Sequence, residues 1–282
     1  TDSYDSLLSR DDLTAAYIFG SNKVSEDLTV AACERGLHCL VEKPMAATEA
    51  GANRMLDAAE ANGVRLMINW PFAWWPQLRH AMQLVSDGLV GQPWQVRYRA
   101  AHEGPVELGC SAPFCEWLYD AELNGAGALM DYCCYGAVLA RALLGMPDRV
   151  SGTALSTGLK PDLKLEDNAV LLLHYPQALA VTEASWTQIG HLTSYQTVLY
   201  GSTGTLLVEP DHGGRLLHAS AEHPDGVEVP IPESPPHLET ASTHFLAAIE
   251  DPTLEIHPLC SAENGRDAQG ILQRGIEAIS AA

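Results

Sequence analysis

The segment Glu42-Lys43-Pro44 places two charged side chains directly after an apolar run. Residues 37–41 suit a buried strand, and Pro44 can neither donate to a sheet nor continue into a helix. Glu42 and Lys43 are therefore expected at the carboxyl end of a strand, where ligands bind in open α/β sheets. A lysine desolvated there can move a proton in a way that a surface lysine cannot. The alternative, a solvated ion pair at a strand end, stays open on these residues alone.

A second group of reactive side chains lies in residues 124–145, where a glycine-rich turn precedes an apolar helix. Asp131 and Tyr135 lie four positions apart near its start and share one face. A carboxylate near a helix N-terminus stays ionised, and the tyrosine can exchange a proton with a substrate hydroxyl. If Lys43 approaches this point, its charge is expected to lower the pKa of Tyr135. The alternative is a capping aspartate beside a tyrosine that only packs in the core.

Aromatic side chains are concentrated in one part of the chain, since five of the six tryptophans fall between positions 70 and 117. Half-exposed aromatic clusters often form the apolar wall of a pocket. The substrate-binding candidates are therefore Trp70, Phe72, Trp74 and Trp117, with His102 and Glu103 as polar candidates at the end of a strand. Core packing, or a solvated strand end for His102, remains an equally simple explanation for any one of them.

The elements that position these residues change character along the chain. In residues 1–69, strand patterns at 13–19, 37–41 and 64–68 alternate with helix patterns at 25–35 and 49–61, which predicts βαβ units and a parallel sheet. After a helix near 75–88, strands are expected at 94–101, 169–175, 179–187, 195–200 and 205–208. Their short links predict a mainly antiparallel sheet.

The expected fold is thus α/β: a partial Rossmann-like domain over residues 1–92, and an α+β domain with a large open sheet over 93–282. The segment 211–236 is rich in Pro, Gly and His and is expected to cross the surface. Helices near 238–250 and 263–280 close the chain.

Composition limits the classes of partner. The 282 residues carry a formal charge of −20, so neither nucleic acid nor a membrane surface is expected as a partner. The seven cysteines contain no Cys-x-x-Cys spacing, which favours reduced thiols in a cytoplasmic protein. No apolar run is expected to approach the ~20 residues that span a bilayer. No metal site is expected, since the nameable ligands (His102, Glu103, Asp131 and His191) are far apart in the sequence.

Taken together, these motifs resemble the Gfo/Idh/MocA oxidoreductase family (glucose-fructose oxidoreductase and inositol dehydrogenase among its members). The resemblance runs from Tyr4 to the last helix and is carried by Glu42-Lys43-Pro44, the segment 125–131 with Tyr135, Glu166-Asp-Asn-Ala169 and Gly201-Ser-Thr-Gly-Thr205. It implies hydride transfer between NAD or NADP and a sugar, polyol or related alcohol. Lys43 and Tyr135 would then handle the proton, and Asp131 would orient the substrate. It also implies a homodimer or homotetramer formed through the open sheet.

The sequence departs from the family pattern in its nucleotide-binding part. It contains no Gly-x-Gly-x-x-Gly turn, which would seat a pyrophosphate at a helix N-terminus. The resemblance implies that the remaining cofactor contacts are made by Asn22, Glu42 and Lys43. Either the chain is a fragment of a normal dehydrogenase, or it is a short form with weakened nucleotide binding. In a short form, the open edge of the parallel sheet is expected to be covered by a partner subunit or by residues 1–12.

Two further functions stay open. The same Lys43–Tyr135–Asp131 set could serve a nucleotide-independent lyase, epimerase or hydrolase acting on carbohydrate, because proton transfer needs no hydride. The chain could also be a non-catalytic sugar-binding subunit that pairs with a full-length relative. The response to nucleotide, and the effect of replacing Lys43, separate these three possibilities.

Overall fold

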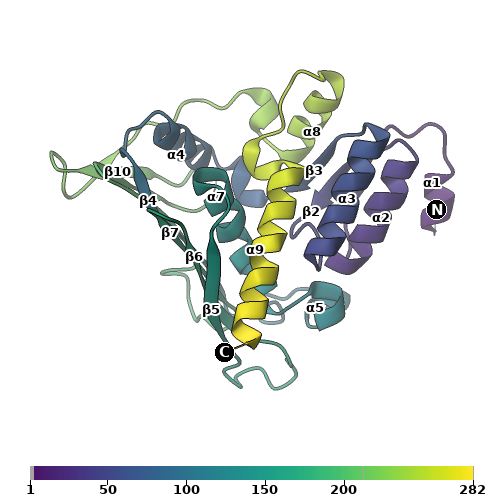
Figure 1. The fold of residues 1–282 in the computed structure, drawn as a ribbon, viewed down its shortest axis with the longest axis horizontal. Coiled ribbons are helices and arrows are strands. Elements are labelled where there is room, and N and C mark those ends of the chain that lie inside the picture. The colour runs from purple at the N-terminus through teal and green to yellow at the C-terminus, as the bar shows by residue number, and fades with distance from the viewer. Residues whose placement is uncertain (1–2, 212, 282) are drawn as a thin grey trace.

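A computed structural model describes residues 3–211 and 213–281, which form two β-sheets joined and covered by helices (Figure 1). The N-terminal sheet has three parallel strands in the order β1 (Ala15–Ile18), β2 (His38–Glu42) and β3 (Leu66–Asn69). The helices α2 (Asn22–Glu34) and α3 (Glu49–Asn62) make the crossovers between them. The carboxyl ends of all three strands therefore lie at one edge of the sheet, as the sequence predicted.

Local capping sets the ends of these helices. The Ser21 hydroxyl accepts from the Val24 amide at 3.3 Å, and the Thr48 hydroxyl accepts from the Gly51 amide at 3.0 Å. The prediction that the first of these helices begins at Ser25 was wrong, because Ser21 is the cap and Ser25 is buried inside α2.

The second sheet has eight strands in the order β11-β10-β9-β8-β4-β7-β6-β5. Every pair is antiparallel except β4 with β7, which run parallel. The mainly antiparallel sheet is thus confirmed. Its strands are β4 (Pro93–Ala101), β5 (Arg149–Leu155), β6 (Asn168–His174), β7 (Leu179–Ser185), β8 (Tyr195–Gly201), β9 (Gly204–Val208), β10 (Leu216–Ser220) and β11 (Val227–Glu228).

Part of this sheet was not foreseen. Residues 211–236 were expected to form only a surface excursion, yet they contain β10 and β11, and Leu216 of β10 is fully buried. The strand β5 was also missed, because Ser151-Gly152-Thr153 in its middle weakens the alternating pattern. Pairing with a neighbouring strand outweighs weak local preference at both places.

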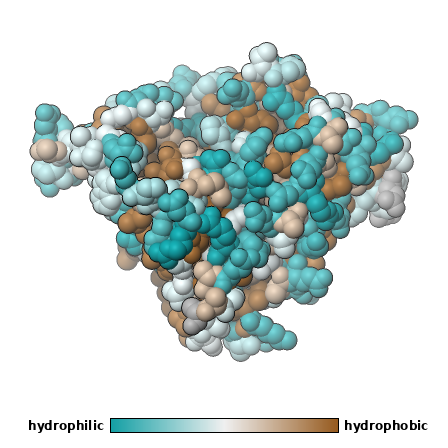
Figure 2. Space-filling view, viewed as in Figure 1, coloured by the Kyte–Doolittle hydropathy of each residue, from teal (hydrophilic) through white to brown (hydrophobic). Residues whose placement is uncertain are grey.

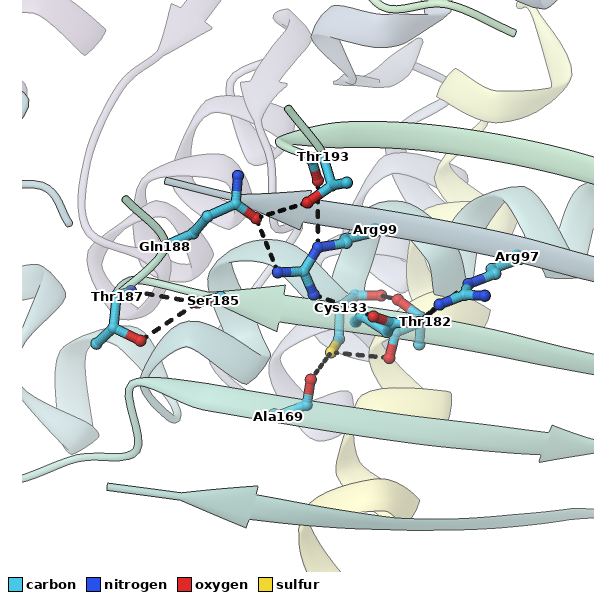
Figure 3. Close-up of polar contacts among 10 residues, drawn as sticks. Arg97, Arg99, Cys133, Ala169, Thr182, Ser185, Thr187, Gln188 and Thr193 are labelled. Carbon is cyan, nitrogen blue, oxygen red and sulfur yellow. Dashed lines mark hydrogen bonds and ion pairs between the residues drawn. The ribbon is translucent and has the colours of Figure 1, made fainter. Parts of the chain in front are cut away.

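The inner face of the large sheet is covered by the helix that carries Asp131 and Tyr135. This helix consists of the π-helix η2 (Leu129–Cys133) and α7 (Cys134–Leu144). Two short helices precede it, α5 (Ala112–Leu118) and α6 (Ala121–Asn124). A Cβ at Gly136 would lie 2.2 Å from the Thr182 hydroxyl, so only glycine allows α7 to lie this close to β7. The same hydroxyl donates to the Cys133 carbonyl at 2.9 Å (Figure 3).

The expectation about apolar runs needs correction. Residues Ala121–Leu144 are long and apolar enough to cross a membrane by length and composition alone, although no such run was expected. In this fold 72% of an 18-residue window of that run is buried. Its apolar character is therefore explained by packing in the core between the sheet and α9.

Further helices complete the fold. They are α1 (Tyr4–Leu8), η1 (Pro71–Trp74), α4 (Pro76–Ser86), η3 (Pro236–Leu238), α8 (Ala241–Glu250), η4 (Pro258–Cys260) and α9 (Ala262–Ser280). The long helix α9 packs against α3, α7 and β5, and so lies between the two sheets (Figure 1). The division at residue 92 stays a prediction.

The N-terminal segment lies against β1. Tyr4, Leu7 and Leu8 line a small cavity of about 150 Å³ together with Tyr17 and Phe19. Within the described residues, no strand pairs with the outer edge of β1. Residues 1–2 of the segment expected to cover this edge lie outside the described residues.

The outer face of the large sheet carries a polar network (Figure 3). Arg97 and Arg99 of β4 both donate to the Glu183 carboxylate of β7, at distances between 2.7 and 3.1 Å. Arg99 also donates to the Gln188 side chain at 2.8 Å and to the Thr193 carbonyl at 3.2 Å. The network lies opposite α7, on the face that no helix of residues 3–211 and 213–281 covers.

Candidate active site

Lys43 and Asp131 form the centre of the candidate site. Lys43 follows the carboxyl end of β2, with a cis peptide bond to Pro44, and Asp131 lies in the π-helix 88 positions further along. The Lys43 Nζ donates to Asp131 Oδ1 at 2.7 Å and to the Asp131 carbonyl at 3.0 Å. The two side chains keep 15% and 13% of their surface exposed. The interpretation of Lys43 as part of a solvated ion pair at a strand end is therefore wrong.

Both oxygens of the Asp131 carboxylate have donors. The Trp186 Nε1 donates to Oδ2 at 3.2 Å, while Oδ1 accepts from Lys43. Trp186 follows β7 and is fully buried, so it fixes the orientation of the carboxylate from the sheet side. Sequence reasoning missed this tryptophan, which lies outside the cluster at positions 70–117.

The Tyr135 ring lies beside the Lys43 ammonium. The Lys43 Nζ is 4.8 Å from the centroid of this ring and 5.4 Å from that of Tyr132, within the range of cation–π attraction. Tyr98 stacks on Tyr135 at 5.7 Å between centroids, and Trp70 and Phe72 meet its ring edge to face. Tyr135 is only 8% exposed.

Burial and charge set the protonation of this group. Burial works against the ammonium, but the nearby Asp131, Tyr135 and Cys134 raise the pKa of Lys43 well above its usual range. Burial also raises the pKa of Tyr135, and the Lys43 charge offsets only part of that rise. The Lys43 charge thus lowers the pKa of Tyr135 as expected, but burial outweighs this effect and leaves the pKa raised. At neutral pH both groups hold their protons.

Glu42 belongs to a neighbouring network and does not pair with Lys43. Its Oε1 accepts from the Tyr17 hydroxyl at 2.6 Å and from Asn69 Nδ2 at 2.7 Å. These three residues come from β1, β2 and β3, so the network ties together the carboxyl ends of the strands. Burial and Glu42 together raise the pKa of Tyr17.

Asn22, predicted to contact a cofactor, is buried at the start of α2. Its Nδ2 donates to the Asn124 carbonyl at 2.9 Å and to the Asn124 side-chain oxygen at 2.8 Å. Both amide hydrogens thus have partners inside the protein. The observed role of Asn22 is to fix the turn that precedes the helix of Asp131.

The predicted substrate-binding aromatics divide into two sets. Trp70 and Phe72 contact Tyr135, whereas the Trp74 ring packs on His244 and His257 and its Nε1 donates to Asn69. Trp117 is half-buried and packs on Phe114. The structure therefore brings two of the four to the Tyr135 ring.

His102 approaches the site from β4. Its ring lies 5.0 Å from that of Tyr132, and its Nδ1 accepts from the Gly104 amide at 2.8 Å. Burial lowers the pKa of His102 to about 4, so the ring is neutral and its Nε2 carries the hydrogen. Glu103 has an exposed side chain, and its carbonyl accepts from Lys160.

Two further residues of the site were given no role in the sequence analysis. Cys134 donates its thiol to the Asp131 carbonyl at 3.0 Å, and burial raises the pKa of Cys134 to about 12. Glu166 accepts from the Gly127 and Leu129 amides at 2.7 and 3.1 Å, which anchors the start of the π-helix. Glu166 belonged to a noted motif, but no role could be assigned to it from sequence.

Among residues 3–211 and 213–281, no three His, Cys, Asp or Glu side chains come together in an arrangement that could hold a metal ion. His191 is exposed on the loop between β7 and β8. The ligand set considered from sequence (His102, Glu103, Asp131 and His191) is thus not assembled.

The amino-acid sequence matches two family models. Residues 1–70 match the model described as an oxidoreductase family with an NAD-binding Rossmann fold, and residues 78–207 match the GFO/IDH/MocA C-terminal domain. These two ranges include Lys43, Asp131 and Tyr135.

Similar proteins include two sugar dehydrogenases. D-xylose 1-dehydrogenase (NADP(+)) 2 of Haloferax volcanii is 35% identical over 55% of this chain and 45% of its own length. D-xylose 1-dehydrogenase [NADP(+)] of Haloarcula marismortui is 32% identical over 70% of this chain and 53% of its own. The chain thus spans about half the length of these curated relatives.

A solved structure of levoglucosan dehydrogenase, in complex with NADH and levoglucosan, superimposes with a TM-score of 0.86 at 19% identity. The match covers 100% of this chain and 82% of that one. At this identity the match establishes the fold.

Proposed function

Because the chain belongs to the Gfo/Idh/MocA oxidoreductase family, we propose that it acts in NAD(P)-linked oxidation or reduction of a sugar or polyol. The observation that carries the proposal is the Lys43 ammonium, bound to Asp131 and facing the Tyr135 ring. The similar D-xylose dehydrogenases make a pentose the first substrate to test. Such an enzyme would work in the cytoplasm, where reduced dinucleotide and free thiols coexist.

The residues at the carboxyl edge of the parallel sheet suit the nicotinamide end of a dinucleotide. Lys43 has three N–H donors, and Asp131 accepts two of them, so one remains for a substrate oxygen. The pyrophosphate has no matching glycine-rich turn in this sequence. When bound, the nicotinamide would accept or supply the hydride.

The residues of the protein itself hold and transfer the proton. In the reducing direction, the charged Lys43 donates a hydrogen bond to the substrate carbonyl oxygen, and Tyr135 is present as a neutral acid. In the oxidising direction, the substrate hydroxyl must give up its proton to this pair. Asp131 holds the ammonium in place, with its own orientation fixed by Trp186. His102 offers a neutral N–H to a further substrate hydroxyl.

The test is reduction of NAD⁺ or NADP⁺, followed by absorbance at 340 nm, with D-xylose and a panel of aldoses and inositols. We expect turnover with at least one pair of nucleotide and sugar. If neither nucleotide binds, as judged by NADH and NADPH fluorescence, hydride chemistry by this chain is contradicted. Sugar conversion without nucleotide would instead support the lyase, epimerase or hydrolase alternative.

We also propose that copies of the chain associate through the outer face of the large sheet. This face carries the Arg97–Arg99–Glu183 network and exposed apolar side chains such as Leu172, which is 40% exposed. No helix of the described residues covers it. Apolar side chains around a paired polar network suit an interface between identical subunits.

A further inference from the structure

A second cavity lies away from Lys43, between α4, the end of α7 and the segment 232–238. Its volume is about 660 Å³. In Figure 2, apolar surface gathers near α4 and α8, while the surface over α9 is mostly hydrophilic. The residues used below are Arg79, His80, Leu143, Ser234, Leu238 and His257, all of which line the cavity.

Arg79 is the main charged group in this cavity. It is half-buried on α4, and its guanidinium donates to the Ala73 carbonyl at 3.1 Å and to the Ser234 hydroxyl. Within the described part of the chain, no carboxylate lies within 4.0 Å of it. Burial lowers the pKa of Arg79, as expected for a cation without a counter-charge.

Within the described residues, Arg79 is one of three half-buried arginines with no carboxylate within 4.0 Å, the others being Arg65 and Arg274. The remaining half-buried cations have carboxylate partners, as Lys160 has Glu107, Arg99 has Glu183 and Arg141 has Asp267. The cavity instead adds His80 and His257, and Glu233 is the one carboxylate among its lining residues.

Gln83 and Ser86 also line the cavity, and the rest of the lining is mainly apolar. It consists of Met82, Val85, Leu143 and Leu238 with the prolines at 76, 93, 232, 235 and 258. The His257 Nδ1 accepts from the Leu259 amide, so the neutral ring carries its hydrogen on Nε2 and can donate from there. A planar guanidinium presents paired donors that match carboxylate or phosphate oxygens.

We propose that this cavity binds a small organic anion, whose carboxylate or phosphate pairs with Arg79 and whose apolar part lies against Leu143 and Leu238. The ligand supplies the counter-charge that the protein does not. The site is separate from the proposed oxidoreductase activity and shares no lining residue with it.

The test uses the fluorescent probe 8-anilinonaphthalene-1-sulfonate, which is both anionic and apolar. Binding to the wild-type protein is measured at low salt, followed by displacement with hexanoate, hexyl phosphate and the uncharged 1-hexanol. We expect displacement by at least one anion and at least tenfold weaker displacement by hexanol. The stronger of the two anions identifies the head group. In Arg79→Gln, the affinity for that anion should fall at least tenfold.

A matched variant separates binding from a purely structural role of a half-buried arginine. Arg274 lies outside the cavity and donates to the Pro147 and Asp148 carbonyls, so in Arg274→Gln anion displacement should stay within threefold of wild type. Melting temperatures are measured for both variants. Equal displacement by hexanol and the anions, or anion affinity unchanged in a folded Arg79→Gln protein, would overturn the proposal.

Discussion

At the scale of single residues, the protonation of Lys43 and Tyr135 governs what the site can do. Lys43 is held charged by Asp131, and Tyr135 is held neutral by burial among Tyr98, Trp70 and Phe72. Both groups are therefore proton donors at neutral pH. Loss of either proton requires alkaline conditions, because a raised pKa moves deprotonation to higher pH.

This arrangement predicts opposite pH dependences for the two directions of reaction. Alcohol oxidation, which needs a proton acceptor, should rise in kcat/KM from pH 7 to pH 10. Carbonyl reduction, which needs a donor, should be flat over pH 6–8. The measurement is kcat/KM in both directions with saturating nucleotide. An oxidation rate that is already flat below pH 8 would show that another group accepts the proton. Tyr135→Phe tests whether the Tyr135 hydroxyl contributes to the pH dependence of kcat/KM.

The sequence identified Lys43, Asp131 and Tyr135 because each lies at a local landmark: a strand end, a helix start and an i, i+4 spacing. It did not predict Trp186 as the second partner of Asp131. That contact joins two elements that are far apart in the sequence, and no motif links them. The direction of the Tyr135 pKa shift could not be predicted from sequence either. The Lys43 charge was visible in the sequence, but the burial that outweighs it was not.

At the scale of elements, the π-helix η2 is the part that presents Asp131 to Lys43. Its start is fixed by Glu166, which accepts two backbone amides, and by close packing at Gly127, where a Cβ would lie 2.1 Å from the Glu166 carbonyl. Because η2 has no side-chain cap of its own, this carboxylate takes the place of one.

Glu166→Ala should therefore destabilise the protein by about 1–3 kcal/mol for each amide left without a partner. For a chain of this size, each kcal/mol corresponds to a fall in melting temperature of roughly 2–4 °C. Thermal unfolding by circular dichroism measures the effect. Glu166→Gln keeps an acceptor oxygen and should lose less. The exposed Glu222→Ala serves as the control, and equal melting temperatures for the two alanine variants would contradict this role.

The parallel βαβ part was predictable because the apolar runs and helix patterns alternate at regular lengths. The strands β5, β10 and β11 were not, since each is short or interrupted by small residues and gains its stability from pairing. The misplaced start of α2 has a similar cause. Both Ser21 and Ser25 are good capping residues, and only the fold determines which one caps.

At the scale of the whole molecule, α9 links the two sheets, and no helix in the described part of the chain covers the outer face of the larger sheet. If copies pair through this face, the protein should sediment as a dimer or tetramer at tens of micromolar. Leu172→Glu, which places a charge on the outer face of β6, should shift it toward the monomer. Leu159→Glu, at a 72% exposed loop position, should not. Analytical ultracentrifugation distinguishes these outcomes, and a monomeric wild type would contradict the interface.

The most direct test of the central claim compares Lys43→Met with Lys164→Met, an exposed lysine, in kcat/KM for sugar oxidation. Since general acid–base groups typically contribute about 10²–10⁴-fold, the account predicts a loss of this order for Lys43→Met, with NAD(P)H binding retained, and none for Lys164→Met. Activity of a folded Lys43→Met protein within a few-fold of wild type would contradict it.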